Sequence, residues 1–202
     1  MTPFRCLVVA LLTLAVILGP ARCQAARGTH KPVNEEFVDV LGDKYRLPGP
    51  DECKAVVLLF VGHDCPISNG YAQVVVRLCK EYLPKKVAFC VVYADADIKK
   101  DVARKHAKEY GYTCPAVLDP EMKLARKVGA TVKPEVAVLD PKGDVLYRGR
   151  IDDLHTAFGK KRPQPTTHDL TDALDAVLAG KPVPVARTKA VGCYIDFPDA
   201  KK

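Results

Sequence analysis

The sequence lacks three features that would assign it to familiar structural classes. No internal repeat or low-complexity segment runs through its 202 residues, which excludes a collagen-like or coiled-coil protein. Lysine and arginine are scattered rather than gathered in stripes, so the net charge of +7 gives little support to nucleic-acid binding. With 48% hydrophobic and 27% charged residues, the composition is that of a globular chain, which excludes wholesale disorder.

Long apolar runs are also missing beyond the N-terminus. The segment from Leu7 to Leu18 is almost wholly apolar, follows Arg5, and is broken by Gly19-Pro20 before small residues at Cys23-Gln24-Ala25. This pattern predicts a secretory signal peptide over residues 1–25. An uncleaved anchor is the alternative, but the run is shorter than the ~20 residues that a membrane span needs. We therefore expect a secreted or periplasmic protein without a membrane span after cleavage.

Removal of the signal peptide would take away two of the eight cysteines. The six that remain are Cys53, Cys65, Cys79, Cys90, Cys114 and Cys193. Outside the cytosol, thiols can persist as disulfides or take part in exchange. Six are too few to hold together a disulfide-built miniprotein, and the chain is long enough to bury a core of its own.

Alternating strand and helix patterns predict an α/β fold. Continuous apolar runs within 54–61 and over 87–93 indicate buried strands, and apolar residues at spacings of three and four predict a helix over 67–83 between them. The other expected elements are a hairpin over 37–40 and 44–47, a helix over 97–110, a strand over 116–118, a helix over 121–128, a hairpin over 136–139 and 145–147, and a helix over 170–178. Residues 152–165 are expected to form a loop, and residues 181–202 a cysteine-containing tail.

A parallel βαβ unit followed by ββα is the thioredoxin arrangement. The sequence thus predicts a thioredoxin-like α/β fold over 34–180, with a central mixed sheet flanked by helices, an N-terminal β-hairpin and an inserted αβ unit. The insertion and the N-terminal hairpin resemble the peroxiredoxin and TlpA/ResA branches of the thioredoxin superfamily. The stretches VGHDCPISNGYAQVV, GATVKPEVAVLDPKGDVLYRGRIDD and ALDAVLAGKPVP resemble the redoxin (AhpC/TSA-type) proteins exported by bacteria. The likeness covers residues 34 to 185 and implies thiol–disulfide or antioxidant chemistry.

Cys65 is the candidate nucleophile. It lies where the first apolar strand ends and the helix over 67–83 begins, and sites in open α/β sheets form at the carboxyl ends of strands. Unpaired N–H groups at a helix N-terminus stabilise a thiolate, the attacking species in disulfide exchange. We expect this thiol to be ionised and reachable, with His63 steadying the thiolate or taking its proton and Ser68 hydrogen-bonded to it. An inert buried cysteine and a solvated loop histidine are the alternatives.

Lys133-Pro134 is the second landmark, because thioredoxin-like proteins place a cis-proline beside the active cysteine at this point. The resemblance implies that Pro134 packs near Cys65 and leaves the preceding backbone free to pair with an extended substrate. A trans proline in a turn is the alternative, since few X-Pro bonds are cis.

Two departures from the family patterns limit the chemistry. Ser68 replaces the second cysteine of the thioredoxin Cys-x-x-Cys motif, so a dithiol cycle inside the motif is impossible. Leu58 and Gly62 stand where peroxiredoxins carry a proline and a threonine, which weakens a peroxidase interpretation. A resolving thiol must come from elsewhere: Cys193, in a tail that could fold back, is the first candidate and Cys114 the second. A static Cys65–Cys193 bridge is the alternative.

These residues predict an exported thiol–disulfide oxidoreductase that acts on a protein or small-molecule disulfide or thiol, with an unidentified electron donor and no cofactor or metal. Three alternatives stay open: a peroxiredoxin-like thiol peroxidase, a non-catalytic binding module, and a Cu(I) chaperone using His63 and Cys65. We expect Cys79 and Cys90 to be packing residues and His106 to lie on a solvated helix face. The sequence does not indicate whether Cys53 is free or bonded to a partner.

Overall fold

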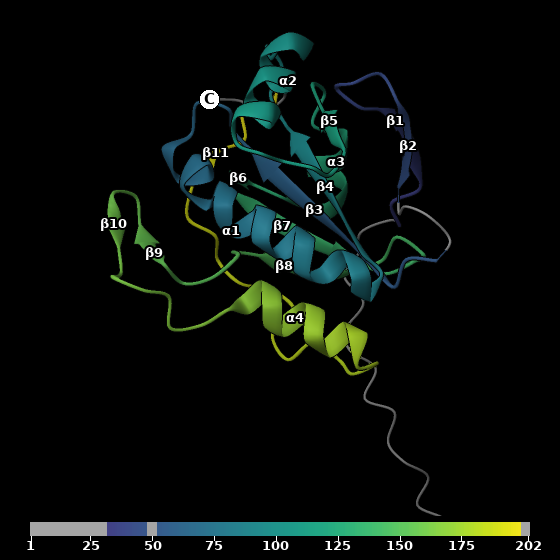
Figure 1. Cartoon of the computed structure of the whole chain (residues 1–202). Coiled ribbons are helices and arrows are strands. Elements are labelled where there is room, and N and C mark those ends of the chain that lie inside the picture. Colours follow the sequence, from purple (N-terminus) through teal and green to yellow (C-terminus); the bar gives the residue numbers. More distant parts are fainter. Residues whose placement is uncertain (1–31, 48–51, 199–202) are drawn as a thin grey trace, which may run out of the picture.

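The computed structural model describes residues 32–47 and 52–198 (Figure 1). The predicted signal peptide therefore lies outside the described residues. A five-stranded mixed sheet forms the centre of the fold, in the order β5-β4-β3-β7-β8, and helices pack on its faces. This is the thioredoxin-like arrangement that the sequence predicts. Along the described ranges, no helix combines the length and the apolar character needed to cross a membrane.

Strand β3 (Ala55–Val61) lies at the centre of the sheet. It pairs in parallel with β4 (Val87–Tyr93) and antiparallel with β7 (Glu135–Leu139). Strand β5 (Ala116–Leu118) extends the parallel half beside β4, and β8 (Val145–Gly149) extends the antiparallel half beside β7. Every residue of β3 is buried because both faces of the sheet are covered, which explains its continuous apolar sequence.

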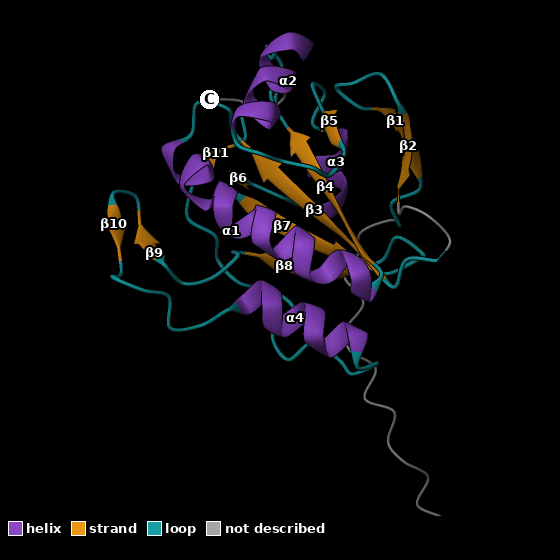
Figure 2. Cartoon of the chain, viewed as in Figure 1, coloured by secondary structure: helices purple, strands orange, loops and turns teal. Residues whose placement is uncertain are grey.

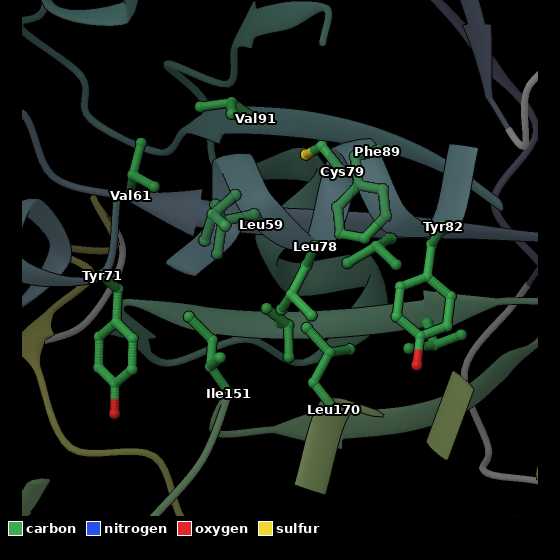
Figure 3. Packing of buried hydrophobic residues seen from close by; sticks show 14 of the residues in the cluster. Leu59, Val61, Tyr71, Leu78, Cys79, Tyr82, Phe89, Val91, Ile151 and Leu170 are labelled. Carbon is green, nitrogen blue, oxygen red and sulfur yellow. The ribbon is translucent and has the colours of Figure 1, made fainter. Parts of the chain in front are cut away.

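Two hydrophobic clusters fill the two faces of the sheet. On one face, α1 (Pro66–Tyr82), α2 (Lys100–Glu109) and α4 (Asp169–Leu178) bury their apolar sides against the strands (Figure 3). On the opposite face, α3 (Lys123–Val128) covers the sheet. Successive side chains of a strand point to opposite faces. Accordingly, Ala55, Val57, Leu59 and Val61 join the first cluster, and Val56, Leu58 and Phe60 join the second.

The N-terminal hairpin forms as predicted and packs at the β5 side of the sheet. Strands β1 (Glu35–Val38) and β2 (Lys44–Leu47) pair antiparallel, with Gly42 in the turn at φ 105°. The carboxylate of Asp39 accepts hydrogen bonds from three backbone N–H groups of that turn. An isolated bridge between Asp39 and Val117 joins the hairpin to β5.

Two strand pairings differ from the sequence-based expectation. Within the predicted loop 152–165, β9 (His155–Ala157) and β10 (Lys160–Lys161) form a hairpin that projects from the body of the protein (Figure 2). In the predicted tail, β11 (Cys193–Tyr194) pairs antiparallel with β6 (Val132–Lys133). These strands are two or three residues long, so they carry no alternation that a sequence pattern could detect. A short 3-10 helix, η1 (Leu83–Lys85), follows α1. The other elements come in the order that the sequence predicts.

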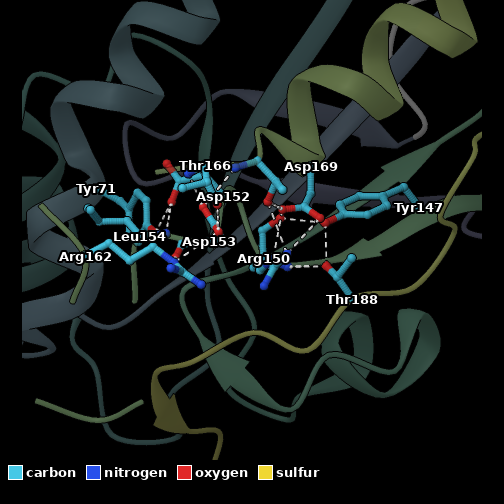
Figure 4. Close-up of polar contacts among 11 residues, drawn as sticks. Tyr71, Tyr147, Arg150, Asp152, Asp153, Leu154, Arg162, Thr166, Asp169 and Thr188 are labelled. Carbon is cyan, nitrogen blue, oxygen red and sulfur yellow. Dashed lines mark hydrogen bonds and ion pairs between the residues drawn. The ribbon is translucent and has the colours of Figure 1, made fainter. Parts of the chain in front are cut away.

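Buried carboxylates hold the polar segment between β8 and α4 in place (Figure 4). Asp153 accepts hydrogen bonds from the N–H groups of Thr166 at 2.6 Å and Thr167 at 3.0 Å, and pairs with Arg162 at 3.1 Å. The hydrogen bonds from Thr166 and Thr167 hold the pKa of Asp153 well below its usual range. Asp152 accepts a hydrogen bond from the Tyr71 hydroxyl of α1. The projecting hairpin thus starts from a fixed base.

His106 is buried, which makes the prediction of a solvated histidine wrong. Its Nδ1 lies 2.8 Å from the Tyr93 hydroxyl, and its Nε2 lies 2.9 Å from Oδ1 of Asn69. Burial, assisted by the nearby His63, lowers the pKa of His106. The ring joins α2 to β4 and to the first turn of α1. It lies on the buried side of α2 together with Ala103 and Ala107, and the many charged residues of this helix hid that side from the sequence pattern.

Candidate active site

Cys65 lies directly after β3 and before the first turn of α1, as the sequence predicts. It is the N-cap residue, with an extended backbone at φ −87° and ψ 111°, and Pro66 takes the first helical position. Proline suits this position because its missing N–H would have no partner inside the helix. The Cys65 carbonyl accepts a hydrogen bond from the Asn69 N–H at 3.0 Å. The thiol therefore sits at a helix N-terminus, where free N–H groups favour negative charge.

Gly62 and Ser68 shape the space around this thiol. A Cβ on Gly62 would lie 2.9 Å from the Cβ of Cys65, so a side chain there would push the cysteine aside. The Gly62 N–H donates a hydrogen bond to Oγ of Ser68 at 3.3 Å, and Ser68 is buried. Burial raises the pKa of Cys65, and a hydrogen bond from Ser68 to the Cys65 thiolate helps to lower it again. Glycine at position 62 is therefore a packing requirement.

Cys193 lies against Cys65 although 128 positions separate them in the chain. Its Sγ is 2.7 Å from Sγ of Cys65. The pairing of β11 with β6 places it there, with Cys193 opposite Lys133 and Tyr194 opposite Val132. A Cβ on Gly192 would come within 2.2 Å of the Lys133 carbonyl oxygen, so only glycine permits this approach. The structure thus brings together the two cysteines that the sequence analysis ranked first.

The segment from 188 to 197, here called the strap, is anchored at both ends. At its start, the Thr188 hydroxyl lies 2.7 Å from the Tyr147 hydroxyl and accepts a hydrogen bond from the Arg150 N–H at 3.0 Å (Figure 4). At its end, Ile195 is buried and its N–H donates to the Thr131 carbonyl at 2.9 Å. The strap is therefore docked on the domain at both sides of Cys193.

The Lys133–Pro134 peptide bond is cis, which confirms that part of the prediction. The Lys133 carbonyl oxygen lies 3.2 Å from Sγ of Cys65 and accepts a hydrogen bond from the protonated thiol. However, the backbone before Pro134 is not free, because β11 already pairs with it. The expectation of an open edge at this point is wrong for this conformation of the chain.

Burial and hydrogen bonding act in opposite directions on the active thiol. Burial raises the pKa of Cys65, but hydrogen bonds from Cys193 and Ser68 outweigh it, so the pKa lies below the ordinary value. The partner shifts the other way: burial, together with the hydrogen bond to Cys65, raises the pKa of Cys193 to about 11. Of the two thiols, Cys65 is thus the one that ionises first as the pH rises, and Cys193 keeps its proton to higher pH.

Cys65 is covered, whereas the sequence analysis expected a reachable thiol. Its side chain is only 1% exposed, because the strap lies over it and presents Cys193, which is half-buried. A pocket of about 760 Å³ lies beside Cys193 and is lined by strap residues and by the β9 hairpin. Phe158 and Tyr194, which are highly exposed, belong to its lining, as do Arg162 and Lys189. Direct access to Cys65 requires β11 to move.

His63 is placed apart from the thiol pair. Its Nδ1 lies 3.9 Å from a carboxylate oxygen of Asp64 and 4.0 Å from one of Asp95, and its carbonyl accepts a hydrogen bond from the Asn69 side chain. Asp64 is exposed, as expected. The predicted role of His63 at the thiolate therefore stays a prediction that these contacts do not support.

The other cysteines occupy separate positions. Cys114, the second candidate for a resolving thiol, packs on the α1 face, where its side chain interacts with Cys79. Cys90 is fully buried in β4, where burial raises its pKa, and Cys79 is buried on α1, so both thiols lie in the core as expected. Cys53 is half-buried. In the part of the chain that the structure describes, no group of three histidine, cysteine or acidic side chains is arranged to hold a metal ion.

Three parts of the site have no signal in the sequence. The Lys133 carbonyl contacts the thiol through its backbone, which any residue carries. Gly192 and Thr188 lie in a segment without periodicity, and their roles depend on the distant strand that they contact. Only the pair of cysteines at 65 and 193 suggested that the chain might close there.

Comparisons with known proteins agree with this fold. A solved structure of an uncharacterized conserved protein from Geobacillus kaustophilus has a TM-score of 0.74 at 27% identity, over 85% of this chain and 93% of that one. A hypothetical protein from Sinorhizobium meliloti has a TM-score of 0.74 at 23% identity, over 87% of this chain and 97% of that one. A thiol-disulfide oxidoreductase from Bacteroides fragilis has a TM-score of 0.51 at 20% identity, over 58% and 89%.

No protein among the curated sequences matches this chain. The family model for Redoxin matches residues 38–162, which is more than half of the chain and includes Cys65 and Pro134. The chain therefore belongs to the Redoxin family of thioredoxin-like proteins.

Proposed function

We propose that the protein is an exported thiol–disulfide oxidoreductase in which Cys65 attacks and Cys193 resolves. The observation that carries this proposal is the 2.7 Å separation of the two sulfurs, together with the opposite shifts of their pKa values. Export is supported by the signal-peptide pattern over residues 1–25. The membership of the Redoxin family supports thiol chemistry in general.

In the first step, the Cys65 thiolate attacks one sulfur of a substrate disulfide. The substrate S–S bond breaks, a mixed disulfide forms at Cys65, and the other substrate sulfur leaves as a thiolate that takes a proton from solvent. The lowered pKa of Cys65 raises the thiolate fraction at neutral pH, which speeds this attack. Besides Cys193, the N-terminus of α1 and the contact with Ser68 stabilise the Cys65 thiolate.

In the second step, Cys193 loses its proton and its sulfur attacks Sγ of Cys65. The mixed disulfide breaks, the second substrate sulfur leaves as a thiol, and a Cys65–Cys193 disulfide forms. The substrate has then gained two electrons and the protein has lost two. A dithiol donor then reduces the Cys65–Cys193 disulfide by two exchange steps of the same kind and restores both thiols.

Access for the substrate depends on the strap. Because β11 consists of two residues paired with two residues of β6, few hydrogen bonds hold Cys193 over Cys65. Displacing these residues exposes the thiolate and also the backbone of Lys133 before the cis-proline. The anchors at Thr188 and Ile195 keep the displaced Cys193 nearby for the second step.

Trapping of the mixed disulfide tests the proposal. Full-length Cys193→Ser protein is mixed with a disulfide-bonded peptide, quenched with acid and analysed by mass spectrometry. We expect a peptide adduct on Cys65 that persists, whereas the wild-type protein releases reduced peptide. Cys114→Ser is the matched control and should behave like the wild type, because the side chain of Cys114 interacts with Cys79 rather than with Cys65 or Cys193.

Two outcomes contradict the proposal. One is a Cys193→Ser variant that still releases peptide at the wild-type rate, which would give the resolving role to another thiol. The other is an adduct that forms on a cysteine other than Cys65.

A further inference from the structure

Cys79 and Cys114 come from different elements but face the same layer of the core. On β4, Phe89 and Val91 point to the face that α1 covers, and Cys79 projects from α1 toward them (Figure 3). Val91 pairs with Ala116 of β5, and its N–H donates to the Pro115 carbonyl at 2.9 Å. Ala116 belongs to the same cluster, and Cys114, two positions earlier, packs against it too.

The two thiols interact within this layer. The side-chain interaction with Cys114, together with burial, raises the pKa of Cys79 well above its ordinary value. The same interaction outweighs burial at Cys114 and lowers the pKa of that thiol. Cys114 is also the more accessible of the two, being half-buried while Cys79 is buried. One sulfur is therefore suited to attack and the other to resolve.

This thiol pair is distant from the candidate active site. Cys65 and Cys79 lie at the N-cap and in the last turn of the same straight run of helix. At ~1.5 Å per residue, the intervening helix is about 20 Å long, far beyond the reach of one sulfur for another. The two pairs thus cannot exchange disulfides directly.

We propose that Cys79 and Cys114 form a second disulfide, a structural cross-link that fastens α1 to the segment leading into the edge strand β5. The oxidant is a soluble disulfide, as found in oxidising compartments. The Cys114 thiolate attacks it, forming a mixed disulfide and releasing one thiolate. Cys79 then loses its proton and attacks Sγ of Cys114, which releases the second thiolate and forms the S–S bond. The protein loses two electrons and the soluble disulfide gains them.

The cross-link closes a loop that contains β4 and α2. A loop of this length constrains the unfolded chain strongly, so in the chain-entropy account the melting temperature should rise by about 10 °C. This property is independent of Cys65 and would hold even if the protein had no catalytic activity.

The test uses full-length protein carrying Cys65→Ser and Cys193→Ser, so that the candidate active site cannot contribute. The protein is incubated with oxidised glutathione, its remaining thiols are alkylated, and it is digested with trypsin and analysed by mass spectrometry. We expect a disulfide-linked pair of peptides, 78–80 with 109–123, and a melting temperature about 10 °C higher before reduction than after it.

A matched variant that adds Cys114→Ser to this background should lose both the linked peptides and the thermal response to reductant. Alkylation of both Cys79 and Cys114 after oxidation of the folded protein would overturn the proposal. So would a stable glutathione adduct on Cys114 with Cys79 free, or a linked pair whose reduction leaves the melting temperature unchanged.

Discussion

Helix α1 carries two cysteines whose acidities are shifted in opposite directions. At its N-terminus, the pKa of Cys65 is lowered while that of its partner Cys193 is raised. In its last turn, the pKa of Cys79 is raised while that of its partner Cys114 is lowered. Free N–H groups at the start of a helix stabilise a thiolate, whereas the carbonyl groups at its end do not. Cys65 thus accepts a hydrogen bond from its partner at one end of the helix, whereas Cys79 at the other end holds its proton more tightly than an ordinary thiol.

The partners of these two cysteines also differ in how they are held. Cys193 belongs to a strap whose only strand pairing over the thiol is two residues long. Cys114 lies two residues before β5, whose register with β4 fixes its position. This difference fits the two roles that we propose, in which the first pair opens and closes during exchange and the second remains closed.

The largest expected effect is the loss of disulfide-exchange activity when the cysteine at the start of α1 is replaced. Replacing Cys65→Ser should reduce disulfide-exchange activity to the uncatalysed background, because serine provides no thiolate. Replacing Cys79→Ser should leave that activity intact, since Cys79 lies at the far end of α1. The measurement is the rate at which a disulfide-bonded peptide is reduced with a dithiol donor present. Equal loss in both variants would contradict separate roles for the two pairs.

The next effect concerns the strap. Gly192→Ala places a Cβ 2.2 Å from the Lys133 carbonyl oxygen, so β11 should detach from β6 and Cys193 should leave Cys65. Alkylation of Cys65 should become faster because its cover is gone. The loss of the hydrogen bond from Cys193 should raise the pKa of Cys65, which offsets part of this gain. Gly70→Ala in α1, where nothing lies within 4 Å of an added Cβ, is the control. Unchanged protection of Cys65 in Gly192→Ala would show that the strap is not its cover.

A smaller effect is expected at Ser68. Ser68→Ala removes a hydrogen bond to the Cys65 thiolate, so the midpoint of Cys65 ionisation should move to higher pH. It also leaves the buried Gly62 N–H without its acceptor, which should lower the free energy of unfolding by about 1–3 kcal/mol. The ionisation is measured by the pH dependence of alkylation, and the stability by denaturant titration. Ser68→Thr, which keeps a hydroxyl, should preserve more of both properties.

The sequence predicted the fold well where apolar runs are long. Strands β3 and β4, each seven residues long, begin and end within a residue of their expected positions, because continuous burial leaves an unmistakable pattern. The pairs β9–β10 and β6–β11 were not predicted, because strands of two or three residues depend on distant contacts.

The candidate site also has some features that the sequence predicts and others that it does not. The position of Cys65 at the end of β3, the cis bond before Pro134 and the return of Cys193 follow from the residues and from the family likeness. The cover over Cys65 and the burial of His106 do not, because each depends on how a segment far along the chain packs. Sequence spacing identifies which thiols are available, and tertiary contacts decide which of them is ionised.

The ionisation of Cys65 shows directly whether Cys193 stabilises its thiolate. Thiolate formation is followed by ultraviolet absorbance against pH, in the wild-type chain and in Cys193→Ala, with Cys65→Ser subtracted from each. We predict a wild-type midpoint below the ~8.5 of a free thiol and a midpoint at higher pH in the variant, because Cys193 no longer donates to the thiolate. A wild-type midpoint at or above the free-thiol value, unchanged by removal of Cys193, would contradict the account.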